Sequence, residues 1–146
     1  MKHTILENIV PTQALANSVE GANDGTKLTG SVIDRRGYQS AVIVVAWGAA
    51  TSGSDSKCAI VLEDAAEVGF NVTNATFVTL AAAKDVHAVG LAYYNVNLIS
   101  ANAFIRVTLD ITYGDGSSPK NPITAIVILG DKNIDPAGST TVSDGS

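Results

Sequence analysis

Residues 104–113 alternate between apolar and polar side chains more regularly than any other part of the sequence. The odd positions 105–113 carry Ile, Val, Leu, Ile and Tyr, and the even positions 104–112 carry Phe, Arg, Thr, Asp and Thr. Successive side chains of a β-strand point to opposite faces, so this period of two predicts a strand with one buried and one solvated face. Gly114, Asp115 and Gly116 follow as a turn that ends the strand.

Further short apolar runs are separated by Gly, Ser and Asn turns, at residues 40–47, 58–65, 87–96 and 121–131. The run at 40–47 contains no charge and predicts a strand buried on both faces. Gly90 predicts a bulge or a close approach of the backbone. No segment has a sustained helical period, although residues 81–84, AAAK, are also compatible with the start of a short helix. The pattern predicts an all-β fold, an antiparallel β-sandwich or a jelly-roll-like single domain.

The 146 residues suit one domain with a substantial core. Residues 1–20 have no sustained period and include Pro11, which predicts an extended N-terminal arm with room for one short strand. Residues 21–131 are predicted to form the β-sandwich domain. Residues 132–146 are rich in Gly, Ser, Thr and Asp, which predicts a flexible C-terminal tail. The arm and the tail are expected to reach neighbouring subunits.

Charged residues make up only 16% of the chain, against about 25% in a typical soluble domain, and the net charge is −5. This balance argues against nucleic acid as a partner, and the lack of a polybasic or long apolar run argues against a membrane. No signal-peptide pattern is found, which predicts synthesis in a cytoplasm. The single cysteine, Cys58, is predicted to be a small buried hydrophobe.

The sequence predicts no catalytic residue, cofactor, metal or small-molecule substrate. His3 and His87 lack zinc-ligand spacing, and the Asp-rich turns fit turn formation better than a calcium loop. Two S-x-x-K matches, at 54–57 and 117–120, fall in predicted loops rather than on a helix. Tyr93 and Tyr94 would point to opposite faces of a strand, which weakens a sugar-stacking platform relative to ordinary packing.

Paired arginines stand before the run at 40–47, and another arginine lies in the alternating strand. Arginine pairs well with carboxylates at interfaces because its planar fork is always charged. The strand after Tyr38 and the strand 104–113 are expected to lie side by side. The alternative, arginines that cap turns on a solvated edge, remains open. The interface candidates are Arg35, Arg36, Tyr38, Arg106 and Tyr113.

Three segments, SVIDRRGYQSAVIVVAWGAATSG, FIRVTLDITYG and PITAIVILGD, together resemble small structural proteins of tailed bacteriophages. The resemblance covers about residues 28–131 in order and rests on a D-x-x-G-Y-x-S-A segment before an apolar strand, a later R-V-x-L strand and a closing strand that ends in L-G. Residues 65–100 depart from it, because they lack a charged S-D-D-G-T-x-F-type hairpin. Residues 100–102, Ser-Ala-Asn, replace a basic-aromatic pair before Phe104.

The resemblance implies a non-enzymatic virion protein, most specifically a capsid decoration or cement protein assembled in the bacterial host cytoplasm. Its implied partners are the major capsid protein and other copies of itself, with a trimer expected by analogy with decoration proteins. Two alternatives remain: a carbohydrate- or host-surface-binding module, such as a head fibre base or adhesin domain, and a neck or tail connector.

Overall fold

A computed structural model of the chain describes residues 10–21, 26–50, 56–71, 76–113 and 120–132. These residues form nine strands and no helix, and residues 81–84 continue a strand instead of starting a helix. The strands are β1 (Val10–Gly21), β2 (Thr26–Thr29), β3 (Ile33–Asp34), β4 (Tyr38–Trp47), β5 (Ser56–Ala65), β6 (Thr76–Asp85), β7 (Gly90–Asn97), β8 (Phe104–Tyr113) and β9 (Lys120–Lys132). The part of the chain described here contains no helix with the length and hydropathy needed to cross a membrane.

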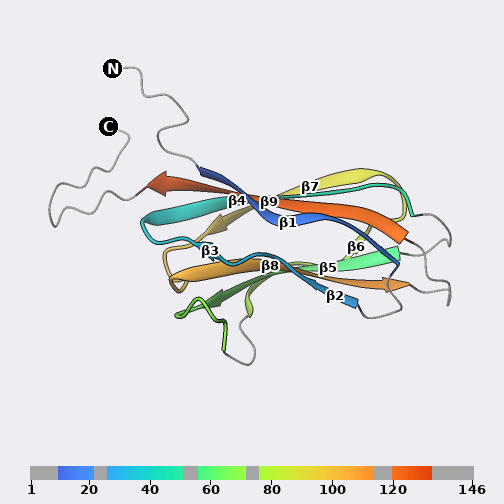
Figure 1. Cartoon of the computed structure of the whole chain (residues 1–146). Coiled ribbons are helices and arrows are strands. Elements are labelled where there is room, and N and C mark those ends of the chain that lie inside the picture. The colour runs from blue at the N-terminus through green and yellow to red at the C-terminus, as the bar shows by residue number, and fades with distance from the viewer. Residues whose placement is uncertain (1–9, 22–25, 51–55, 72–75, 114–119, 133–146) are drawn as a thin grey trace, which may run out of the picture.

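The strands build two antiparallel sheets that face each other (Figure 1). Sheet A has the order β1-β9-β4-β7, and sheet B has the order β2-β8-β5-β6 with β3 also paired to β8. Most connections cross from one sheet to the other, so strands that are neighbours in a sheet are mostly distant in sequence. The predicted β-sandwich is confirmed, and the order in which the chain passes between its two sheets is that of a jelly roll.

The segment expected to be an arm contributes a strand to the domain. β1 pairs with β9 from Val10↔Leu129 to Gly21↔Lys120, with two register shifts along the way. Backbone pairing to β9 satisfies the N–H and C=O groups on one side of this segment, which favours its addition to the sheet despite its weak apolar period. The domain therefore includes β1. Lys132, predicted to begin the tail, is the last residue of β9, while residues 1–9 and the rest of the predicted tail, 133–146, lie outside the described residues.

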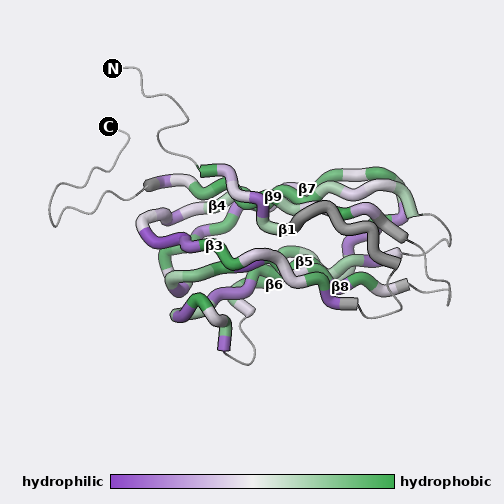
Figure 2. Tube along the Cα trace, in the orientation of Figure 1, coloured by the Kyte–Doolittle hydropathy of each residue, from purple (hydrophilic) through white to green (hydrophobic). Residues whose placement is uncertain are grey.

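The core lies between the two sheets. The predicted buried face of β8 is confirmed, since the side chains of Ile105, Val107, Leu109 and Ile111 are fully buried, whereas Thr108 on the face predicted to be solvated is buried as well. Cys58 is buried as predicted, and this burial raises the pKa of its thiol to about 12. Green, hydrophobic stretches run along both layers in Figure 2, whereas purple gathers at the turn between β3 and β4.

Trp47 closes one end of the core and explains Gly90. The indole Nε1 of Trp47 donates a hydrogen bond of 2.7 Å to the carbonyl oxygen of Ala88. A Cβ atom on Gly90 would come within 2.5 Å of the same ring, a distance at which atoms overlap. The close backbone approach predicted at Gly90 is therefore confirmed.

Candidate interaction surface

The outer face of sheet A is the surface that points away from sheet B. Its members alternate along each strand with the buried core residues, and the strand register brings them into common rows. We define this outer face by Pro11 and Gln13 on β1, Thr124, Ile126 and Ile128 on β9, Ser40, Val42, Val44 and Ala46 on β4, and Leu91, Tyr93, Asn95 and Asn97 on β7.

An apolar band crosses the middle of this outer face. Val44 is paired with Ile126 on one side and with Tyr93 on the other. Directly opposite residues of antiparallel strands put their side chains on the same side, so these three form one row. Ile126 is 40% exposed and Tyr93 is 68% exposed, and Leu91 in the adjacent row is 61% exposed. Large side chains of this kind normally avoid solvent when they are contiguous.

No residue of this outer face carries a charge. The four strands of sheet A carry their charges only near their ends, at Glu20, Lys120, Asp131 and Lys132. The solvated face of an antiparallel sheet is ordinarily polar, and in most domains it includes charged residues. The outer face of sheet A therefore differs from an ordinary solvated sheet face in its lack of charge and its exposed apolar side chains.

The prediction that residues 40–47 are buried on both faces is wrong for the chain alone. The inward residues Ala41, Ile43 and Val45 are buried, whereas the outward residues Val42 and Val44 are only half-buried. An unbroken apolar run indicates that both faces avoid water, but it does not distinguish cover by the same chain from cover by another molecule.

The outer face of sheet B, unlike that of sheet A, carries charged side chains. Glu63 accepts a hydrogen bond from Lys27 Nζ at 2.8 Å and another from Arg106 Nε at 2.7 Å. The guanidinium of Arg106 also lies over the Phe70 ring, 4.2 Å from its centroid. Burial alone would raise the pKa of Glu63, but the hydrogen bonds from Lys27 and Arg106 outweigh it and hold the pKa below its ordinary value. These charges are satisfied within the chain.

Arg35 and Arg36 lie in the turn between β3 and β4, where Gly37 adopts a positive φ of 87°. Arg35 donates hydrogen bonds to the carbonyl oxygens of Asn102, at 2.7 Å, and of Ala101. Arg35 thereby fastens this turn to the connection between β7 and β8, through backbone oxygens rather than through the expected carboxylate.

Arg36 pairs with Asp34, two residues earlier, through an Nε to Oδ1 hydrogen bond of 2.9 Å. The hydrogen bond from the Arg36 side chain holds the pKa of Asp34 below its ordinary value. Arg36 is exposed and also lies over the Phe104 ring. This pairing fits the alternative of an arginine on a solvated turn, and it leaves a contact of Arg36 with another subunit as a prediction.

The structure does not bring the interface candidates into one site. Tyr38 is partly buried beside the core and belongs to sheet A, whereas Arg106 belongs to sheet B. The expectation that their strands lie side by side is wrong, because β4 pairs with β7 and β9 and β8 pairs with β2, β3 and β5. Tyr113 pairs with Ser56 through its backbone, and its side chain lies outside the described residues.

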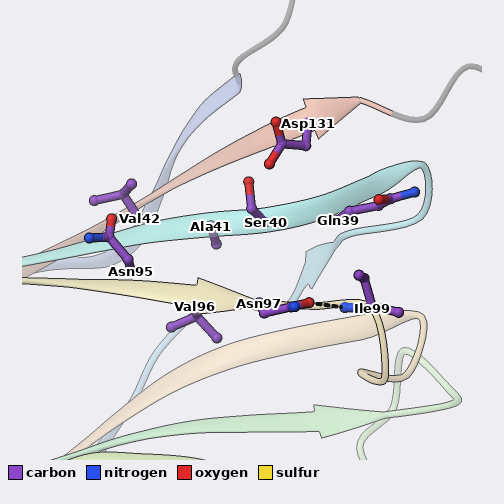
Figure 3. A pocket seen from close by; sticks show the side chains of 9 residues that line it. All are labelled: Gln39, Ser40, Ala41, Val42, Asn95, Val96, Asn97, Ile99 and Asp131. Atoms are coloured by element: carbon purple, nitrogen blue, oxygen red, sulfur yellow. Dashed lines mark hydrogen bonds between the residues drawn. The ribbon is translucent and has the colours of Figure 1, made fainter. Parts of the chain in front are cut away.

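An open groove of about 450 Å³, lined by both polar and apolar side chains, lies at one end of sheet A, where β4 begins and β7 and β9 end (Figure 3). Asn97 is held there by its Oδ1, which accepts a hydrogen bond of 2.9 Å from the backbone N–H of Ile99. The polar side chains that line the groove are Gln39, Ser40, Asn95, Asn97 and Asp131. Amides and a hydroxyl outnumber the single carboxylate in this set, so the groove presents hydrogen-bonding groups with little charge.

Sequence reasoning chose arginines as interface residues, missed Leu91 and Ile126, and considered Tyr93 only for a sugar-stacking platform. The available signal was the shared lack of internal charge in residues 38–50, 90–97 and 121–130, which the topology places in one sheet. Among the described residues, no group of three or more His, Cys, Asp or Glu side chains is arranged to hold a metal ion.

No protein-family model matches the sequence, and no curated protein matches it. Solved structures of infectious bursal disease virus proteins do match the fold. The VP2 subviral particle gives a TM-score of 0.56 at 12% identity over 83% of this chain and 32% of that chain. The structure of the Gt strain of the virus gives a TM-score of 0.56 at 11% identity over 83% of this chain and 31% of that chain.

A D431N mutant VP2 protein in T=1 particles gives a TM-score of 0.54 at 12% identity over 84% of this chain and 31% of that chain. This chain thus spans about a third of the length of the proteins it matches. At such low identity the likeness shows the fold alone: this chain has a jelly-roll fold that is shared with proteins solved as virus or virus-derived particles.

Proposed function

We propose that this protein is a structural protein of a virus particle, and most specifically a decoration or cement protein on the head of a tailed bacteriophage. Its outer face of sheet A would lie on the major capsid protein, and its role would be mechanical. The observation that carries this proposal is the lack of charge across that outer face, together with the exposed Leu91, Tyr93 and Ile126. The shared fold with virus-particle proteins and the sequence resemblance support it.

The area of the outer face of sheet A is large enough for such a contact. Four strands spaced about 4.8 Å apart, each about eight residues long at about 3.4 Å per residue, give a face of roughly 500 Å². Burial of such a face against a partner of equal size removes on the order of 1,000 Å² from water, the lower limit for a specific interface. Many copies on one shell multiply a weak single contact, so modest affinity is sufficient.

Co-sedimentation with purified phage heads that lack this protein tests the proposal. The parent protein is expected to bind to saturation, and Ile126→Lys is expected to weaken binding at least about tenfold because a buried, unpaired ammonium is costly. Val68→Lys is the matched control, since Val68 is 64% exposed on the turn after β5, away from sheet A, and should bind like the parent. Thermal unfolding of all three proteins checks that the fold is kept.

Salt dependence gives a second readout. Contacts between charged surfaces weaken as salt shortens the Debye length to about 4 Å near 0.5 M, whereas apolar contacts do not. Binding through the outer face of sheet A is therefore expected to persist at about 0.5 M NaCl. Loss of binding in salt, or equal binding by Ile126→Lys and the parent, would contradict this surface as the contact.

The groove at the end of sheet A favours a second candidate, a carbohydrate-binding module. Its amide and hydroxyl groups, from Gln39, Ser40, Asn95 and Asn97, match the hydrogen-bonding needs of sugar hydroxyls. A glycan array distinguishes the candidates: binding to a glycan that Asn95→Ala abolishes, without binding to heads, would favour this second function.

A further inference from the structure

Each sheet of the sandwich ends in two edge strands: β1 and β7 in sheet A, and β2 and β6 in sheet B. Alternate residues of an edge strand direct their N–H and C=O groups away from the sheet, where another strand can pair with them. Proteins that stay monomeric usually block such edges with proline, charge, bulges or very short strands.

Three of the four edges carry such blocks. β1 contains Pro11 and has two shifts of register against β9. β2 is only four residues long. β6 has three register irregularities against β5 and ends in Lys84 and Asp85.

β7 carries none of these blocks. Its register with β4 runs without a shift from Ser40↔Asn97 to Trp47↔Gly90, and its sequence, GLAYYNVN, contains no proline and no charge. Leu91 and Tyr93, both largely exposed, stand on its outer side. Over the described residues, β4 is the single pairing partner of β7. β7 is thus a regular, neutral and apolar edge of the kind that accepts another strand.

We propose that β7 of one copy pairs antiparallel with β7 of a second copy, which joins the two A sheets into one continuous eight-stranded sheet. A second copy fits because an antiparallel pair of identical strands is related by a two-fold axis, so one neutral segment complements itself. The chain carries a net charge of −5, and an edge without charge lets two such molecules approach without placing like charges opposite each other. This proposal is independent of the function proposed above.

The alternation of side chains along β7 limits the registers in which two copies of this strand can pair. Opposite residues of antiparallel strands point to the same side, so the outward Leu91, Tyr93 and Asn95 must meet outward residues of the second copy. The two such registers nearest to full overlap place either Tyr93 or Tyr94 on the two-fold axis. In the first register Tyr93 faces Tyr93 of the second copy, and in the second register Tyr93 faces Asn95.

Sedimentation equilibrium of the full chain tests whether the dimer exists. The parent protein is expected to dimerise, and Tyr93→Lys is expected to raise the dimer dissociation constant at least about tenfold. The two lysines would face each other directly in the first register and would be diagonal neighbours, about 7–8 Å apart, in the second. Val68→Lys, which changes a residue of similar exposure far from β7, should dimerise like the parent. A parent protein that stays monomeric at millimolar concentration, or a Tyr93→Lys variant that dimerises equally well, would overturn the proposal.

Disulfide cross-linking separates edge pairing from face-to-face packing. Opposite residues of paired strands have Cα atoms about 4.5–5.5 Å apart, within the range of a disulfide, whereas packed sheets lie about 10 Å apart. Tyr93→Cys alone should therefore cross-link in the first register, and a mixture of Tyr93→Cys with Asn95→Cys should cross-link in the second. Ile126→Cys, on the outer face but two strands from the edge, should not cross-link.

The native Cys58 does not interfere, because it is fully buried. A dimer that forms without a cross-link at position 93 or 95 would show that the copies associate through another surface and would overturn edge pairing. Failure of edge pairing leaves the head-binding result untouched, because Ile126→Lys tests the outer face of sheet A and Tyr93→Cys tests its edge.

Discussion

Replacement of Arg106 by alanine is expected to destabilise the isolated domain. Arg106 is only 22% exposed, and its Nε donates to Glu63, whose side chain is only 6% exposed, at 2.7 Å. A hydrogen bond between charged groups is worth about 1.5–3 kcal/mol, and a cation over an aromatic ring adds about 0.5–1 kcal/mol. The ring here is Phe70.

The loss is limited by Lys27, which still pairs with Glu63 at 2.8 Å in the variant. The cost should therefore stay below the ~3–5 kcal/mol typical of a buried charge left without any partner. We expect Arg106→Ala to lower the free energy of unfolding by about 2–3 kcal/mol. Urea unfolding followed by Trp47 fluorescence measures this change.

Arg36→Ala is the matched control, because Arg36 is exposed and pairs with an exposed Asp34. Exposed ion pairs contribute little, so this variant should unfold like the parent. A double-mutant cycle with Glu63→Gln should return a coupling of at least about 1 kcal/mol between Arg106 and Glu63. Unchanged stability of Arg106→Ala would refute this reasoning, and lost head binding with full stability would support the interface role expected from the sequence.

Three further predictions concern single groups. The pKa of Glu63 lies below its ordinary 4.5, so its ion pairs stabilise the fold above that pH, and this stabilisation is lost as the pH falls through the lowered pKa. The free energy of unfolding of the parent, measured at several pH values, should therefore decrease on acidification, and the decrease should be smaller for Glu63→Gln. Gly90→Ala should push against the Trp47 ring, which lies 2.5 Å from the added Cβ, and lower stability by about 1–3 kcal/mol with a changed Trp47 emission; unchanged stability and emission would contradict this contact. The thiol of Cys58, with a pKa of about 12, should react with a thiol reagent at pH 8 only after denaturant is added, and rapid labelling of the native protein would show that the site is open.

Periodicity predicted the sandwich because a half-buried strand shows its buried side directly. Residues 104–113 alternate, and the structure buries the alternate positions from Ile105 to Ile111, with Thr108 buried in addition. The pairing partners could not be read from the same pattern. β4 and β9 are neighbours although some seventy residues separate them, and this proximity arises from the crossing connections rather than from local sequence.

The candidate surface was harder to predict than the fold. Arginines attract attention as interface residues, yet Arg35 and Arg106 are bound within the chain, to backbone oxygens and to Glu63. The apolar outward residues looked like core in the sequence because an uncovered apolar face and a covered one have the same composition. Only the register, which aligns Ile126, Val44 and Tyr93, shows that they form one surface.

The pairing of β1 with β9 decides how the domain resists a pull on its two ends. Val10 lies opposite Leu129, so the first described strand starts where the last one finishes. A force that separates Val10 from Leu129 acts along the hydrogen bonds between β1 and β9, because these bonds run perpendicular to the strands. The bonds would therefore break one after another, starting at this end of the pair. Force transmitted through the broad sides of the sandwich would instead be shared among many strands at once. Such a domain resists force better when the force is applied to the outer faces of its sheets than when it is applied at Val10 and Leu129.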